Sequence, residues 1–227
     1  MAPRIRTTAS YSTHQEYTVD FFGENLIVTV TSNSSVINRW IRDVHFYNHP
    51  LVVGVGVQWT PAFYYYDDSP PESNYYSDSP TESDYHFSPP VDTLQLCVGN
   101  RCIIIQLSHC DSVPDILHGF VEDQETTFVG VWNSQDARKL EESKHQLWIS
   151  DLLDLRKFVV DSQGRSLRGC SFEEIVEVCL GRRGVSLDPE ISMSDWRFNL
   201  SHDQILQASI DAFVCCKLGV RNRLWEV

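Results

Sequence analysis

The residues with the strongest metal-binding or nucleophilic chemistry in this chain are eight histidines and seven cysteines, and they form no recognised motif. The cysteines include no Cys-x-x-Cys pair and the histidines no His-Glu-x-x-His sequence, so neither residue type predicts a zinc site. A Gly-x-Ser-x-Gly nucleophile turn and a glycine-rich phosphate loop are also missing from the sequence. We therefore expect the cysteines to be reduced thiols that pack as small apolar side chains.

Three segments spaced along the chain resemble the motifs of the DEDD 3′–5′ exonucleases, particularly the Werner-syndrome-type exonuclease domain found in plants. The first is VVGVGVQWTP at 52–61, and TLQLCVGNRCIIIQL follows it at 93–107. The second is FVGVWNSQDARKL at 128–140. The third is WRFNLSHDQILQASIDAFVCCKLG at 196–219, preceded by the helix-like LRGCSFEEIVEVCLG at 167–181. The resemblance extends in register over residues 15–225.

This resemblance implies an α/β, RNase H-like exonuclease fold with a mixed sheet of five to six strands flanked by helices. It also implies phosphodiester hydrolysis with Mg²⁺ or Mn²⁺, held by four carboxylates. Oxygen ligands suit these hard cations, and two cations about 3.5–4 Å apart activate a water and stabilise the leaving oxygen.

The chain departs from the family pattern at two of the four acidic positions. The motif-one Asp is replaced by Gly56 and the motif-one Glu by Gln58, whereas Asp136 and Asp211 retain the acids of motifs two and three. A glycine offers no ligand, and a neutral amide cannot balance the charge of a cation. Loss of two carboxylate ligands should cost more than the roughly 10- to 100-fold typical of an outer-shell partner.

The residue that orients the attacking water is also replaced. Gln207 stands at the position of the family's Tyr, and Leu206 at the position of the alternative His. We expect a weak or inactive 3′–5′ exonuclease relative that binds nucleic acid or a protein partner and, if inactive, needs no cofactor. The alternative is an active Mg²⁺- or Mn²⁺-dependent 3′–5′ exonuclease on DNA or RNA ends, with Asp136 and Asp211 as metal ligands.

Basic and aromatic residues next to the second motif are candidates for holding a nucleic-acid strand. Arg138 and Lys139 could contact phosphates, and Trp132 could stack on a base of single-stranded or 3′-end DNA or RNA. The competing interpretation is a solvated surface, because the chain carries 31 acidic against 18 basic residues, a net charge of −13. Such a chain does not attract nucleic acid through its overall field.

Hydrophobic patterning predicts the elements that would position these residues. Leu51–Trp59 reads as a strand buried on both faces. Ser171 and Ser201 each begin a capping box that opens a helix, the second of which carries Asp211. Two hairpins are expected, one over 16–31 and one over 93–107. Strands that precede interleaved helices indicate an α/β domain on a mixed sheet.

The domain is expected to cover residues 15–227, after a flexible N-terminal tail at 1–14. Within it, YYDDSPPESN (65–74) and YYSDSPTESD (75–84) form a tandem repeat with seven identical positions. Its Pro, Ser and acidic residues predict a disordered acidic insertion over 62–90. It is either a tolerated duplication or a segment that is phosphorylated or bound by a partner.

The longest apolar runs are strand-length, too short to span a membrane, and the N-terminus lacks a secretory h-region. We therefore expect an intracellular protein of the nucleus or cytoplasm, with no membrane partner.

Overall fold

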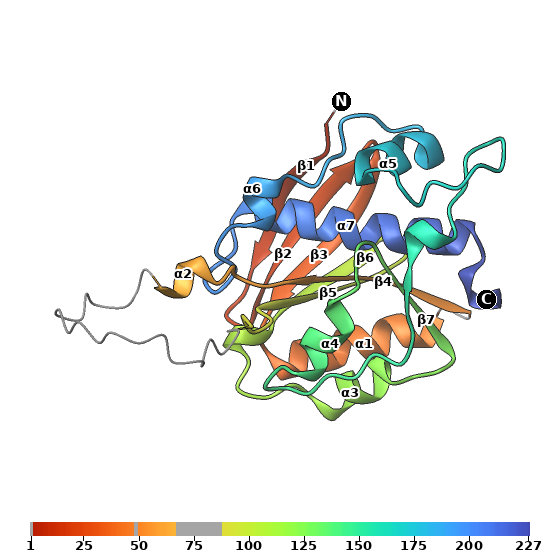
Figure 1. Ribbon diagram of the computed structural model, residues 1–227. Helices are drawn as coiled ribbons and strands as arrows, with labels where there is room; N and C mark the ends of the chain where they lie inside the picture. Colours follow the sequence, from red (N-terminus) through yellow and green to blue (C-terminus); the bar gives the residue numbers. More distant parts are fainter. Residues whose placement is uncertain (1, 48–49, 67–87) are drawn as a thin grey trace, which may run out of the picture.

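An eight-stranded mixed sheet with helices on both faces forms the framework (Figure 1). The computed structural model describes residues 2–47, 50–66 and 88–227. In sheet order the strands are β1 (Arg4–Ser10), β2 (His14–Phe21), β3 (Glu24–Thr31), β6 (Arg101–Gln106), β5 (Thr93–Val98), β4 (Leu51–Gln58), β7 (Thr126–Gly130) and β8 (Leu152–Asp154). The helices are α1 (Ser34–Tyr47), α2 (Phe63–Tyr66), α3 (Asp115–Val121), α4 (Asp136–Glu141), α5 (Phe172–Leu180), α6 (Pro189–Ser192) and α7 (His202–Arg221).

The fold class predicted from the sequence is confirmed, and the sheet is wider than expected. Strands β3 and β6, β4 and β7, and β7 and β8 pair in parallel, whereas the other neighbours pair antiparallel. The extra width comes from both edges, where β1 and the three-residue β8 are added.

The predicted flexible tail over 1–14 is wrong for most of its length. Residues Arg4–Ser10 form β1, which pairs with β2 from Arg4↔Asp20 to Ser10↔Gln15. The strand is largely exposed and polar, and only Ile5 packs against the core. Its stability comes from backbone pairing with β2. Because such pairing does not depend on apolar side chains, the strand shows almost no hydrophobic pattern in the sequence.

Two hydrophobic cores lie on opposite faces of the sheet. One contains α7 and α5 with residues such as Val52 and Ile104, and the other contains α1, α3 and α4 with residues such as Val53 and Ile103. Successive strand residues point to opposite faces, so a strand covered on both faces is apolar throughout. Strand β4 is buried on both faces, as predicted.

Helix α7 lies unusually close to β4 because of a glycine. A Cβ on Gly54 would lie 1.8 Å from the backbone oxygen of Ala212. The close approach of Gly54 to Ala212 fixes the depth at which α7 crosses the sheet (Figure 1).

Both predicted capping boxes are present. The box at Ser201 and Gln204 starts α7, and the box at Ser171 and Glu174 starts α5.

Two further sequence expectations meet the structure only in part. Most of the predicted 62–90 insertion lies outside the described residues, but its first residues form α2, with the Tyr65 amide donating to Ala62 at 3.0 Å. The expectation that all cysteines are reduced is wrong for Cys97 and Cys102, which form a disulfide. These two residues are directly opposite in the β5–β6 hairpin, so strand pairing brings their sulfurs together.

Among the described residues, the helices are all too short or too polar to cross a bilayer.

Candidate functional site

The candidate site lies at the end of β4, on the sheet face that α7 covers. Gly56 pairs with Gln95 of β5, and both are on this face. A Cβ added to Gly56 would lie 3.4 Å from Oδ2 of Asp211. Folding thus brings the first and third motif positions, which are more than 150 residues apart in sequence, into van der Waals range.

Asp211 comes from the middle of α7 and is only 8% exposed. The thiol of Cys215, one turn later, lies 3.8 Å from its Oδ1 and is a weak donor. Burial and, as a smaller cause, the charge of Asp136 together raise the pKa of Asp211 to about 8. A carboxyl group in this environment favours its neutral form.

Asp136 is the first residue of α4 and is 7% exposed. Its backbone amide donates to the carbonyl of Asn133 at 3.2 Å. Burial raises the pKa of its side chain to about 7, and Lys139 opposes this shift. The charge of Asp136 also acts on the pKa of Asp211, so the two retained acids are near enough to interact electrostatically.

Gln95 is a site residue that the sequence did not single out. It is fully buried, and its Nε2 donates to Oγ1 of Thr93 at 2.5 Å. Its Oε1 lies 2.7 Å from the position of a Gly56 Cβ and, in the described part of the chain, has no hydrogen-bond partner. The amide therefore fills the space into which a side chain at position 56 would extend.

The other two replaced positions have separate surroundings. Gln58 ends β4 and is half-buried, with its carbonyl accepting from the amide of Asp92 at 3.0 Å. Gln207 lies one turn before Asp211 and holds the α6 segment: its Nε2 donates to Ser192 Oγ at 2.8 Å, and its Oε1 accepts from the Asp188 amide at 2.7 Å. Gln207 thus has a structural role of its own.

The two basic candidates next to Asp136 differ sharply in exposure. Arg138 points outward, with a loose 3.8 Å ion pair to Glu142. Lys139 is 5% exposed, donates to the carbonyl of Pro89 at 2.8 Å and lies 4.6 Å from the ring centroid of Trp59. Burial and the charge of Arg138 lower the pKa of Lys139. Only Arg138 of this pair offers its charge to a strand in solution.

Trp132 lies in the turn between β7 and α4 and is 43% exposed. Its φ of 50° puts it in the left-handed region, which bulky residues rarely adopt. The guanidinium of Arg156 lies 5.3 Å from its ring centroid and is fixed by Asp154, at 2.6 Å between Nη2 and Oδ2. A bulky residue held in this backbone conformation is a feature common at functional sites.

A buried polar network that the sequence analysis did not predict anchors the chain after β4. Thr60 donates to Oδ2 of Asp92 through its amide and its hydroxyl, both at 2.7 Å. The Thr60 hydroxyl also lies 3.1 Å from Asp195, and the amide of Trp196 donates to it at 2.9 Å. Each of these contacts joins Thr60 to a residue more than 30 positions away in sequence, so only the fold brings them together.

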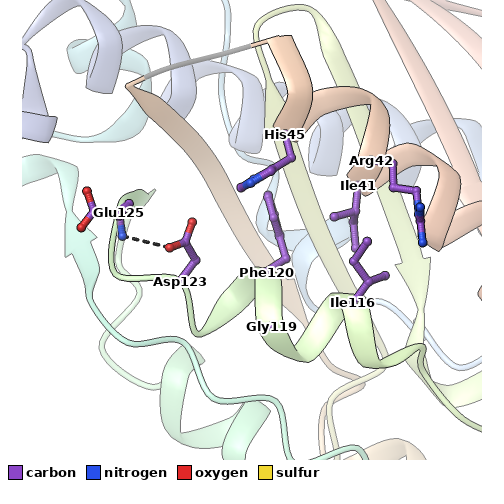
Figure 2. A pocket seen from close by; sticks show the side chains of 8 residues that line it. All are labelled: Ile41, Arg42, His45, Ile116, Gly119, Phe120, Asp123 and Glu125. Carbon is purple, nitrogen blue, oxygen red and sulfur yellow. Dashed lines mark hydrogen bonds between the residues drawn. The ribbon is translucent and has the colours of Figure 1, made fainter.

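Within the described residues, groups of three or more His, Cys, Asp or Glu side chains arranged to hold a metal ion are absent. One hollow lies between α1 and α3, on the face of the sheet opposite α7 (Figure 2). It measures about 780 Å³, with a floor of Ile41, Ile116 and Phe120 and charged residues at its rim.

The sequence matches no family model and no curated protein. Solved structures do match. Escherichia coli RNase D, an exoribonuclease involved in structured RNA processing, is 16% identical with a TM-score of 0.60, over 86% of this chain and 45% of that one. The fold is the RNase H-like exonuclease fold.

Two further structures agree. The catalytic core of RRP6 from Trypanosoma brucei is 12% identical with a TM-score of 0.59, over 88% of this chain and 46% of that one. The EXO domain of Aedes aegypti Nibbler is 12% identical with a TM-score of 0.58, over 86% and 87%. The chain thus spans less than half of the first two structures and most of the third. At these identities the likeness concerns the exonuclease fold.

Proposed function

We propose that this chain is a member of the 3′–5′ exonuclease family, related to the plant Werner-type domains, that has lost two-metal catalysis and binds single-stranded nucleic acid. The observation that carries the loss of catalysis is the contact between Gly56, Gln95 and Asp211. The space for a motif-one carboxylate is taken by the uncharged amide of Gln95. The residues present therefore do not fit a two-cation centre, which needs several converging carboxylates.

The replacement of the water-orienting residue supports the same conclusion. In this chain Gln207, at the position of the water-orienting Tyr, is engaged with Asp188 and Ser192. We infer that the site is maintained as a folding element of β4, α4 and α7.

Nucleic-acid binding is proposed from the side chains that remain presented at the site. Trp132 offers an exposed ring, fixed through Arg156 and Asp154. Base–aromatic stacking contributes about 1–3 kcal/mol per base and tolerates any sequence. Arg138 adds one exposed charge, whereas the burial of Lys139 argues against its direct phosphate contact. Binding should therefore rest more on stacking than on charge.

The test is fluorescence anisotropy of labelled single-stranded oligonucleotides, deoxythymidine and uridine 12-mers, titrated with protein in EDTA. We expect metal-independent binding that weakens by about 1–3 kcal/mol in Trp132→Ala and is retained in Trp132→Phe. Trp148→Ala is the matched control, because Trp148 is also exposed, at 56%, but lies in the segment between α4 and β8. Binding that requires Mg²⁺ or Mn²⁺, or no binding of either oligonucleotide, would contradict the proposal.

A further inference from the structure

A second group of exposed aromatic residues lies beside the candidate site, where α2 meets the segment before α7. Phe198 is 62% exposed and Phe63 is 55% exposed. The guanidinium of Arg197 lies 4.7 Å from the ring centroid of Tyr65 and 5.3 Å from that of Phe198. We call Phe63, Tyr65, Arg197 and Phe198 the Arg197 stacking surface.

Hydrogen bonds and an ion pair hold Arg197 of this surface in place. Asp195 binds the Arg197 side chain at 2.7 Å between Oδ2 and Nη2 and at 3.0 Å between Oδ1 and Nε. Oδ1 of Asp195 also lies 3.1 Å from the hydroxyl of Thr60, the centre of the buried network that includes Asp92. The carbonyl of Arg197 lies 2.6 Å from Nε2 of His109. Side chains fixed in this way lose little conformational freedom when a ligand binds.

A chain of contacts through the interior links the surface to the candidate site. Asp136 and Lys139 share α4, and Lys139 lies over the ring of Trp59. Trp59 directly precedes Thr60, which anchors Asp195 and, through it, Arg197. Figure 1 shows α2 directly after the carboxyl end of β4, which Gln58 closes.

We propose that the Arg197 stacking surface binds bases of a single-stranded nucleic acid whose neighbouring nucleotides lie at the candidate site. Flat aromatic rings and a guanidinium plane stack on any base. This occupant is favoured over an apolar protein segment because a guanidinium lies within 4.7 and 5.3 Å of the two ring centroids and because contacts link the surface to the nucleic-acid site proposed above. The inference rests on that proposed function and extends it to a second contact.

Because Asp195 neutralises Arg197, this contact should depend little on salt. Phosphate contacts by unpaired basic residues make affinity fall steeply as salt increases. A stacking contact adds affinity without making the affinity more sensitive to salt. The Arg197 stacking surface should therefore change the dissociation constant at every salt concentration by a similar factor.

The experiment measures anisotropy of the same 12-mers with three variants of the exposed ring at position 198. Phe198→Ala should weaken binding about fivefold to a hundredfold, which corresponds to the loss of one stacked base. Phe198→Leu, which keeps apolar area but lacks a π face, should weaken it nearly as much. Phe198→Trp should bind at least as well as the original chain. Intrinsic Trp fluorescence of that variant, measured against the original chain, should show additional quenching on titration with unlabelled oligonucleotide.

The outcomes separate this inference from the proposed function. If the original chain binds and Trp132→Ala weakens it, but all three Phe198 variants bind normally, the Arg197 stacking surface is refuted and the proposed function stands. If Phe198→Leu retains full affinity while Phe198→Ala loses it, the contact is apolar and the stacking assignment is wrong. If the original chain binds neither oligonucleotide, both proposals fail. Trp148→Ala again serves as the control for an exposed aromatic side chain.

Discussion

Replacement of Asp211 by Asn should stabilise the protein, and the gain should increase from pH 5 to pH 8. The folded-state pKa of Asp211 is raised from 3.8 to about 8 by burial and by Asp136. The folded state therefore binds the proton more tightly than the unfolded chain does. The stabilisation due to protonation is complete below pH 3.8 and is lost as the pH rises toward 8.

The magnitude follows from the same shift. Between the unfolded and folded pKa values, each pH unit costs about 1.4 kcal/mol of unfolding free energy. Three units, from pH 5 to pH 8, set an upper limit of about 4 kcal/mol for this group. Relaxation and water entry reduce such values in real proteins, so we expect about 1–3 kcal/mol more gain at pH 8 than at pH 5. An Asn side chain is neutral throughout and escapes this loss.

The assay is urea unfolding of the original chain and of Asp211→Asn at pH 5, 6, 7 and 8, in EDTA. Asp203→Asn is the matched control, because Asp203 is an exposed acid on the same helix. If Asp211→Asn is less stable than the original chain at pH 8, or if its gain does not depend on pH, Asp211 is ionised and well compensated. The reasoning about a neutral, metal-free site would then be refuted.

Three further predictions concern packing and exposure. Gly54→Ala should destabilise by at least about 3 kcal/mol in urea unfolding, because its Cβ would overlap the Ala212 carbonyl, whereas Gly119→Ala, in open space on α3, should be neutral or stabilising. Replacement of residues 67–87 by a short Gly-Ser linker should change the melting temperature by less than about 5 °C. The reason is that β4 and β5 pair directly, from Gly54↔Cys97 to Gln58↔Thr93. A larger drop would show that the segment packs on the domain. Lys139→Ala should lower the melting temperature more than Arg138→Ala does, since only Lys139 is buried against Trp59 and Pro89, and equal effects would contradict that difference.

The parts of the fold that could be predicted are those with a strong local pattern. The apolar run of β4 and the capping boxes of α5 and α7 are visible in short stretches of sequence and are confirmed. Strand β1 could not be predicted because its residues are polar and its stability comes from backbone pairing with β2. The Cys97–Cys102 disulfide depends on the hairpin register, which spacing alone does not determine.

The site shows the same division. Only the family resemblance could predict one shared site for Asp136, Asp211 and Gly56, because local sequence patterns carry no information on the distances between these residues. The role of Gln95 could not be foreseen, since a Gln in a buried strand gives no sign of the side chain it faces. The burial of Lys139 against the ring of Trp59 could not be predicted either, because the sequence does not distinguish a buried basic residue from its exposed neighbour.

The central claim is the loss of two-metal catalysis, and it is tested most directly by a nuclease assay on a labelled, recessed 3′ end with Mg²⁺ and with Mn²⁺. We predict no degradation by the original chain. The triple variant Gly56→Asp, Gln58→Glu, Gln207→Tyr should regain metal-dependent 3′–5′ activity, with single variants nearly inactive, because the groups act as a unit. The Asp at 56 requires Gln95 Oε1, the end of a flexible side chain, to move from 2.7 Å. Robust degradation by the original chain that EDTA stops and Asp211→Ala abolishes would contradict the account.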